Sequence, residues 1–129
     1  MRVHHTGIVV EDMALSLEIY KKLGYEAISD IVEDNVQNNR LLFIKLGNEV
    51  LELIEPMNEQ STVYNAGNYG YHHICYEVED LDTVKAEFKG LKIGKIFTEK
   101  ITAPAFDNRN IMFAYLKNGT IIEYVEAEK

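Results

Sequence analysis

Two pairs of adjacent histidines and two pairs of closely spaced glutamates carry the residue types that bind metal ions. The histidine pairs are His4/His5 and His72/His73, and the glutamate pairs are Glu52/Glu55 and Glu123/Glu126. Imidazole nitrogens combined with carboxylate oxygens suit a borderline divalent ion such as Zn, Ni, Co, Mn or Fe. One member of each pair would complete a four-ligand site.

The period of a β-strand limits which members can contribute. Neighbouring side chains on a strand point to opposite faces, so only one histidine of each pair can face a shared site. Glutamates three residues apart also fall on opposite faces. Periodicity does not choose between the members, because both faces of these strands carry apolar residues.

These pairs recur because the sequence repeats itself. The segment HHTGIVVEDM begins at His4 and HHICYEVEDL begins at His72, and eight of the 25 positions 4–28 match at this offset of 68 residues. The ends of the two halves also match, since LFIKLGNEVLELIE (42–55) and MFAYLKNGTIIEYVE (112–126) align after one insertion. Such similarity predicts two copies of one structural unit.

The pattern of each copy predicts a strand, a helix and three further strands. The first copy predicts a strand at 3–10, a helix at 13–23, strands near 26–33, 40–46 and 49–55, and a turn at Gly47-Asn48. We expect Asp12 to be the N-cap of its helix, and Gly24 to end it. Between them, Leu15, Ile19 and Leu23 are at helical spacing. The second copy predicts a strand at 72–78, a helix at 81–89, strands near 92–98, 111–116 and 120–126, and a turn at Asn118-Gly119.

The expected fold class is therefore α+β, with the βαβββ unit present twice. We expect a single domain over 1–129, made of repeats 1–58 and 70–129 joined by a polar linker at 59–69. The formal charge of −8 argues against nucleic acid and against anionic membrane surfaces as partners. No apolar run approaches the roughly 18 residues of a membrane span.

The chain has one cysteine, which excludes an internal disulfide. Cys75 lies within an apolar strand pattern and is expected to be a small buried core residue. We expect a reducing, cytoplasmic setting. The N-terminal residues lack the apolar stretch of a signal peptide.

Four short motifs, in this order, resemble strands of a known family. His5–Asp12 and His73–Asp80 look like the two metal-binding first strands of the vicinal oxygen chelate superfamily, which includes glyoxalases, bleomycin resistance proteins and dioxygenases. Leu51-Glu52-Leu53 and Ile122-Glu123-Tyr124 look like its terminal strands. The resemblance implies that His5, Glu52, His73 and Glu123 bind one divalent metal ion. It also implies a cupped mixed sheet around the ion and a homodimer.

The resemblance further implies an enzyme acting on a small molecule. Two glutamates in the ligand set disfavour a dioxygenase, which would use two histidines and one carboxylate. The expected activity is that of an isomerase, epimerase or lyase that moves a proton on a carbon next to a carbonyl, in a small acyl or α-keto substrate such as a thioester or thiol adduct. The alternatives are glyoxalase I, a lactoylglutathione lyase, and a non-catalytic small-molecule-binding or antibiotic-resistance protein.

Within the family, the local match is nearest to methylmalonyl-CoA epimerase, through 43–48 and 51–56. Either Glu123 or Glu52 would act as the base by analogy with glyoxalase I. The segment Ala103–Asn110 differs from the corresponding segment of these relatives. We expect its Phe106 to pack over the metal and its Arg109 to bind a substrate carboxylate or phosphate.

The chain also departs from these relatives. The general-base glutamate of the epimerase would fall near Val36-Gln37, where no carboxylate stands, although Glu33 and Asp34 are close. A turn typical of glyoxalase I before the last strand is replaced by Leu116–Gly119.

Overall fold

The structure is a computed structural model that describes residues 1–64 and 68–128. Part of the expected linker, residues 65–67, lies outside the described residues. The chain divides into two units. We call His5–His72 the first unit, and Met1–His4 together with His73–Lys129 the second unit.

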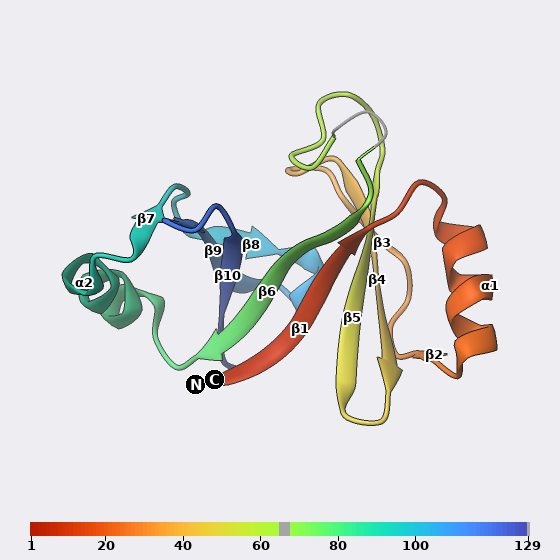
Figure 1. The fold of residues 1–129 in the computed structure, drawn as a ribbon, viewed down its shortest axis with the longest axis horizontal. Coiled ribbons are helices and arrows are strands. Elements are labelled where there is room, and N and C mark those ends of the chain that lie inside the picture. The colour runs from red at the N-terminus through yellow and green to blue at the C-terminus, as the bar shows by residue number, and fades with distance from the viewer. Residues whose placement is uncertain (65–67, 129) are drawn as a thin grey trace. The chain divides into compact units, whose positions relative to one another are not determined.

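The first unit contains one helix and strands of the first sequence copy (Figure 1). Its elements are β1 (Arg2–Val9, which begins in the second unit), α1 (Met13–Leu23), β2 (Glu26–Ala27), β3 (Val32–Asp34), β4 (Asn39–Leu46) and β5 (Glu49–Pro56). The strand order is β2-β4-β5-β1, and β3 also pairs with β4. Strand β1 is parallel to β5, whereas β4 and β5 form an antiparallel hairpin.

The second unit repeats this arrangement with the second sequence copy (Figure 1). Its elements are β6 (Gly70–Val78, which begins in the first unit), α2 (Leu81–Leu91), β7 (Gly94–Ile96), β8 (Ile101–Ala103), the 3-10 helix η1 (Pro104–Phe106), β9 (Arg109–Leu116) and β10 (Ile121–Glu126). The strand order is β6-β10-β9-β7, with β8 also paired to β9, and β6 is parallel to β10. The predicted α+β class with a mixed sheet is confirmed.

The second strand expected in each copy is not continuous, so the predictions for 26–33 and 92–98 were wrong. The range 26–33 is split into β2 and β3, and 92–98 is shortened to β7, with β8 lying beyond the predicted range. In the first unit the hydroxyl of Ser29 accepts the Phe43 N–H at 3.0 Å. In the second unit the hydroxyl of Thr98 accepts the Phe113 N–H at 2.9 Å. A side-chain oxygen therefore takes the place of a backbone carbonyl at this point, and the strand breaks into two pieces.

Both helices begin after an aspartate whose carboxylate accepts a backbone N–H of the first turn. Asp12 accepts the Leu15 N–H at 2.9 Å, and Asp80 accepts the Thr83 N–H at 3.0 Å. Helix α1 ends at Gly24, which has a left-handed φ of 110°. These interactions confirm the predicted bounds of α1, while α2 runs two residues beyond its predicted end. Within the described part of the chain, no helix has the length and apolar character that a membrane span requires.

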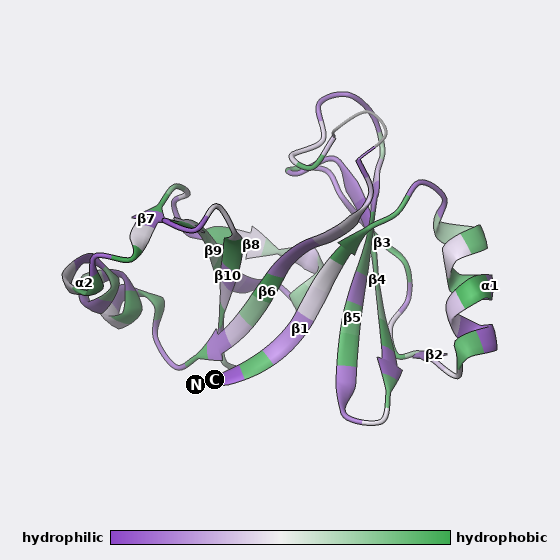
Figure 2. Cartoon of the chain, in the orientation of Figure 1, coloured by the Kyte–Doolittle hydropathy of each residue, from purple (hydrophilic) through white to green (hydrophobic). Residues whose placement is uncertain are grey.

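Each helix covers one face of its own unit's sheet. The first core comprises Val10, Met13, Leu42, Ile44 and Leu53, and the second comprises Val78, Leu81, Phe88, Met112, Ala114, Ile122 and Tyr124. Hydrophobic and hydrophilic stretches alternate along both helices (Figure 2). In α1 the side facing the core carries Met13, Leu17 and Tyr20, whereas Leu15, Ile19 and Leu23 are exposed.

Candidate metal centre

The first unit brings His5 of β1 together with Glu52 of β5. The Nε2 atom of His5 lies 3.4 Å from Oε1 of Glu52. Both residues are buried, with 1% and 4% of their surface exposed. The imidazole packs edge-on against Phe43, with ring centroids 5.2 Å apart. Parallel pairing places Glu52 opposite Gly7, two residues beyond His5.

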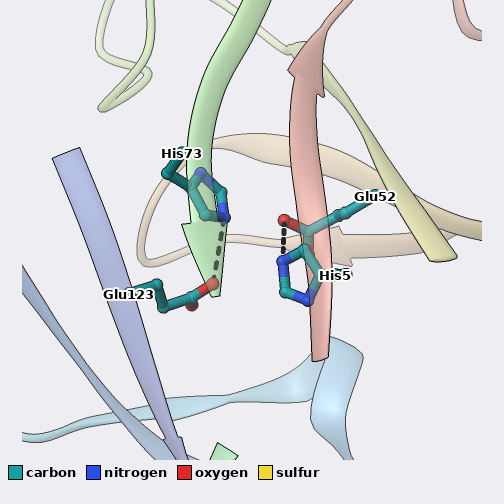
Figure 3. A group of neighbouring side chains, drawn as sticks. All are labelled: His5, Glu52, His73 and Glu123. Atoms are coloured by element: carbon teal, nitrogen blue, oxygen red, sulfur yellow. Dashed lines mark ion pairs between the residues drawn. The ribbon is translucent and has the colours of Figure 1, made fainter. Parts of the chain in front are cut away.

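The second unit repeats this pair with His73 of β6 and Glu123 of β10. Nε2 of His73 lies 3.0 Å from Oε1 of Glu123, and the two residues are 1% and 2% exposed. The His73 imidazole packs edge-on against Phe113 at 5.7 Å. Glu123 lies opposite Cys75, again two residues beyond the histidine. Figure 3 shows the ion pair within each unit, and the shared register makes the two pairs structurally equivalent.

The other histidine of each pair is less buried than its neighbour. His4 and His72 are only partly buried, and the ring of His4 packs against Phe106 with centroids 5.1 Å apart. Cys75 is fully buried, as expected for a core residue. The two histidines that contact the glutamates are therefore His5 and His73, the pair that the family resemblance implied.

The second glutamate of each terminal strand has a different role, which the sequence analysis missed. Glu55 accepts the backbone N–H of Met13 at 2.7 Å, and Glu126 accepts that of Leu81 at 3.0 Å. Each carboxylate therefore satisfies an otherwise unpaired donor at the first turn of a helix, where negative charge is also favoured by the helix dipole. The three-residue spacing was a usable signal, because it places these glutamates on the helix-covered face.

The structure brings Arg109 and Phe106 to each other. The Arg109 guanidinium lies 5.6 Å from the centre of the Phe106 ring and donates to Glu77 at 2.9 Å. Hydrogen bonds from Arg2 and then Arg109 hold the pKa of Glu77 below its ordinary value. Arg109 lies four residues before Phe113 on β9, about 13 Å along the strand from the residue that pairs with Glu123.

The carboxylates nearest to the expected general-base position are already engaged. Asp34 is fully buried, and its Oδ1 accepts the Val36 and Gln37 N–H groups at 2.9 and 3.1 Å. Glu33 is exposed and pairs with Arg40 at 3.3 Å. Asp34 therefore holds the turn between β3 and β4.

The side chains of each pair suit a divalent metal ion. His5 and Glu52 offer one imidazole nitrogen and one carboxylate oxygen, and so do His73 and Glu123. All four are more than nine-tenths buried. Burying carboxylates is costly without a cationic partner, and a divalent ion supplies that partner. A mixed nitrogen and oxygen donor set is compatible with several transition metals.

Comparisons with known proteins identify the family of this chain. Residues 4–113 match the family model described as Glyoxalase/Bleomycin resistance protein/Dioxygenase superfamily. Human mitochondrial methylmalonyl-CoA epimerase is 28% identical over 135 residues, which cover 98% of this chain and 74% of that protein. The ethylmalonyl-CoA/methylmalonyl-CoA epimerase of Cereibacter sphaeroides is 28% identical over 132 residues, covering 95% of each chain.

A solved structure shares the fold over the same extent. A methylmalonyl-CoA epimerase variant from Streptomyces coelicolor, in complex with 2-nitronate-propionyl-CoA, superposes with a TM-score of 0.85 and 25% identity, covering 100% of this chain and 99% of that one. The family-model match spans most of the chain and both histidine strands. The chain belongs to the glyoxalase/bleomycin resistance protein/dioxygenase superfamily.

Proposed function

We propose that the protein is a metal-dependent epimerase that moves a proton on the carbon next to the carbonyl of a small acyl-CoA thioester. The observation that carries the proposal is the pair of buried, structurally equivalent His–Glu contacts, His5–Glu52 and His73–Glu123. The curated relatives named methylmalonyl-CoA epimerase support the substrate class. The proposal assigns both pairs to one ion.

The chemistry of the proposed reaction needs a base beside an acidified C–H bond. A bound divalent ion would supply Lewis-acid polarisation of the substrate carbonyl. The carboxylate of Glu123, or that of Glu52, takes the α-proton and the same or a second group returns it to the other side of the carbon. Burial of both carboxylates excludes water that would otherwise compete for the proton.

The proposal extends to the whole chain. We place both units in one domain, 1–129, because the length of the chain suits one compact domain. We expect a homodimer, since the family resemblance implies one. A cytoplasmic setting completes the proposal, supported by the single buried cysteine, Cys75. Sedimentation velocity of the purified chain gives the oligomeric state directly, and a species of one chain's mass would contradict the dimer.

Metal content is the first test of the proposal. Protein purified without added metal should contain one ion per chain, and both His5→Ala and His73→Ala should lose it, because each removes an imidazole donor. The neighbouring variants His4→Ala and His72→Ala are matched controls that should keep the ion. Elemental analysis measures the content, and circular dichroism checks that each variant is folded.

Other metal contents would contradict specific parts of this model. Two ions per chain would show that each pair binds separately. Loss of the ion from His4→Ala and His72→Ala, with full content in the other two variants, would place the centre on the opposite strand faces. Folded protein that binds no divalent ion at all would favour the non-catalytic binding protein.

Proton exchange tests the reaction itself. In deuterated water, methylmalonyl-CoA should exchange its α-hydrogen in the presence of metal-loaded protein, and Glu123→Gln or Glu52→Gln should slow exchange by roughly 10²-fold or more, the usual contribution of a general base. Nuclear magnetic resonance follows the loss of the α-hydrogen signal. Turnover of a hemithioacetal with no exchange of any acyl-CoA would identify glyoxalase I instead.

A further inference from the structure

A stack of aromatic rings lies beside the candidate metal ligands of the second unit, on and next to strands β9 and β7. Phe113 of β9 packs edge-on against His73, with ring centroids 5.7 Å apart. The ring of Phe97, the residue after β7, stacks on Phe113 at 6.2 Å and on Tyr115 at 4.1 Å, with interplanar angles of 28° and 26°. We call Phe97, Phe113 and Tyr115 the aromatic shelf.

Strand pairing places the shelf on the sheet face that carries Glu123. Phe113 lies directly opposite Glu123 on the antiparallel strand β10, and the side chains of directly paired residues share a face. Tyr115 is two residues further along β9 and therefore lies on the same face. The Phe97 N–H donates to the Phe113 carbonyl at 3.1 Å. The shelf thus begins one strand spacing from Glu123, about 5 Å, and extends to two spacings, about 10 Å, at Phe97.

The rings of the shelf are accessible to a ligand. Phe97 and Tyr115 are 42% and 50% exposed, and Phe113 is only partly buried. Exposed apolar groups that gather at one place, rather than lying scattered, are typical of surfaces that bind another molecule. Small-molecule sites are lined mainly by apolar and aromatic side chains around a few polar groups, which here are His73 and Glu123.

The first sequence copy offers an internal comparison for each position of the shelf. The counterpart of Phe113 is Phe43, which packs on the histidine of its own unit at 5.2 Å. The counterpart of Phe97 is Ile28, because the Ile28 N–H donates to the Phe43 carbonyl at 2.9 Å. One of the two stacked partners of the phenylalanine is therefore aliphatic in the first unit.

The third position differs more strongly between the copies. The counterpart of Tyr115 is Lys45, which also lies two residues after the phenylalanine and is exposed. The equivalent strands therefore form with an isoleucine and a lysine at these two positions. Because the fold does not require the rings of Phe97 and Tyr115, a ligand of the second unit is the better explanation for them.

The position of the shelf identifies the part of a substrate that meets it. In the proposed reaction the α-carbon lies beside the carboxylate of Glu123, so a group attached to that carbon and directed across β9 meets Phe113 first and Phe97 next. A methyl group is too short to extend one strand spacing of about 5 Å, so it does not reach the second ring. A flat ring does reach it, and aromatic rings favour offset-stacked and edge-to-face contacts with one another.

We propose that the aromatic shelf binds an aromatic ring carried on the α-carbon of the substrate, so that the preferred substrate is an aryl-substituted acyl thioester. This inference rests on the proposed function, because it names the group on the carbon whose proton moves. Phe97 and Tyr115 then determine specificity by contacting the ring, while proton transfer stays with the carboxylate. Methylmalonyl-CoA uses the same carboxylate without the outer part of the shelf.

Calorimetric binding of two CoA thioesters of similar shape tests the shelf without turnover. The metal-loaded protein should bind 2-phenylpropionyl-CoA several-fold more tightly than 2-cyclohexylpropionyl-CoA, because only the flat ring stacks. The double variant Phe97→Ile/Tyr115→Lys carries the residues of the first copy and should lose about tenfold in affinity for the phenyl compound, since two ring contacts are removed. Tyr64→Lys, which removes a ring that is 46% exposed in the first unit, is the matched control and should bind as the unchanged protein does.

Three outcomes of these measurements would overturn the proposal. Equal affinity of the unchanged protein for the two thioesters would rule out recognition of an aromatic ring. Full affinity of the double variant for 2-phenylpropionyl-CoA would rule out the shelf as the site. Sedimentation velocity tests the competing occupant, a second copy of the chain: a double variant that loses the dimer but keeps its affinity would show that the shelf is a subunit interface.

The kinetics of α-hydrogen exchange separate specificity from chemistry. The double variant should show a raised KM for 2-phenylpropionyl-CoA and unchanged exchange of methylmalonyl-CoA, because the methyl substrate does not reach Phe97. Circular dichroism checks that the variant is folded. An equal loss of exchange with both substrates in folded protein would contradict a role in specificity.

The two proposals fail in different ways. Ring-dependent binding of 2-phenylpropionyl-CoA without exchange of any acyl-CoA would leave the shelf supported and remove the epimerase. Exchange of methylmalonyl-CoA, together with equal binding of the phenyl and cyclohexyl compounds, would leave the epimerase supported and remove the shelf.

Discussion

At the scale of single residues, each terminal strand carries two glutamates with separate tasks. Glu52 and Glu123 contact a buried imidazole on one face of the sheet. Glu55 and Glu126 face the helix on the other side and accept a backbone N–H from its first turn. The alternation of strand side chains is what divides these tasks.

A different carboxylate, Glu77, makes folding sensitive to acid. The hydrogen bonds from Arg2 and Arg109 lower its pKa in the folded state below the ordinary value of 4.5. A lowered folded pKa means that the ionised carboxylate stabilises the fold above about pH 4.5, and that this contribution is lost as the pH falls through the lower folded pKa. Glu77→Gln should therefore be less stable than the unchanged protein at pH 7, and the difference should shrink below pH 4.5.

Urea unfolding followed at several pH values between neutral and acid measures this difference. Glu18→Gln serves as the control, because Glu18 is largely exposed and its contact with Lys22 is 3.7 Å long. The control should follow the pH profile of the unchanged protein. A constant gap between Glu77→Gln and the unchanged protein at all pH values would show that the arginines do not hold the carboxylate ionised.

At the scale of elements, helix α1 shows which features a sequence pattern predicts and which it does not. Its bounds were predictable because Asp12 and Gly24 act locally, one as an N-terminal cap and the other through its left-handed φ. The side of the helix that meets the core depends on tertiary packing. The apolar spacing of Leu15, Ile19 and Leu23 indicates a helix, yet these residues are exposed and a second apolar side, led by Met13, is buried.

Substitutions on the two sides of α1 should differ in their effect on stability. Met13→Ala should lower the free energy of unfolding by about 2–5 kcal/mol, because Met13 is 3% exposed and its removal leaves a cavity. Ile19→Ala should change it by less than about 0.5 kcal/mol, since Ile19 is 50% exposed. Chemical denaturation of both variants measures the contrast. Similar losses in the two would mean that Ile19 is covered in solution, as in a dimer interface.

The interruptions of these strands could not be predicted from the sequence, and the reason is physical. Residues 26–33 and 92–98 carry enough β-forming character to predict single strands. The break depends on the Ser29 and Thr98 hydroxyls accepting hydrogen bonds from strand β4 or β9, far away in sequence. Only the fold brings these partners together, so local propensity has no information about them.

At the scale of the whole molecule, the repeat was the strongest predictor. It indicated two equivalent units, each with one histidine strand and one glutamate strand, and the structure has both in the same register. Choosing His5 over His4 required the family resemblance, because both faces of that strand carry apolar residues. The cap role of Glu55 required three-dimensional neighbours.

The separation of the two glutamate tasks has an evolutionary consequence. Loss of Glu52 or Glu123 leaves the helix caps of Glu55 and Glu126 untouched, so a descendant can lose the proposed metal ligands and still fold. Loss of Glu55 or Glu126 weakens the scaffold whatever chemistry it carries. Selection for the proposed activity and selection for stable folding therefore act on different residues of the same strand. Substitutions at the two kinds of position can therefore change the chemistry of the site and the stability of the fold independently.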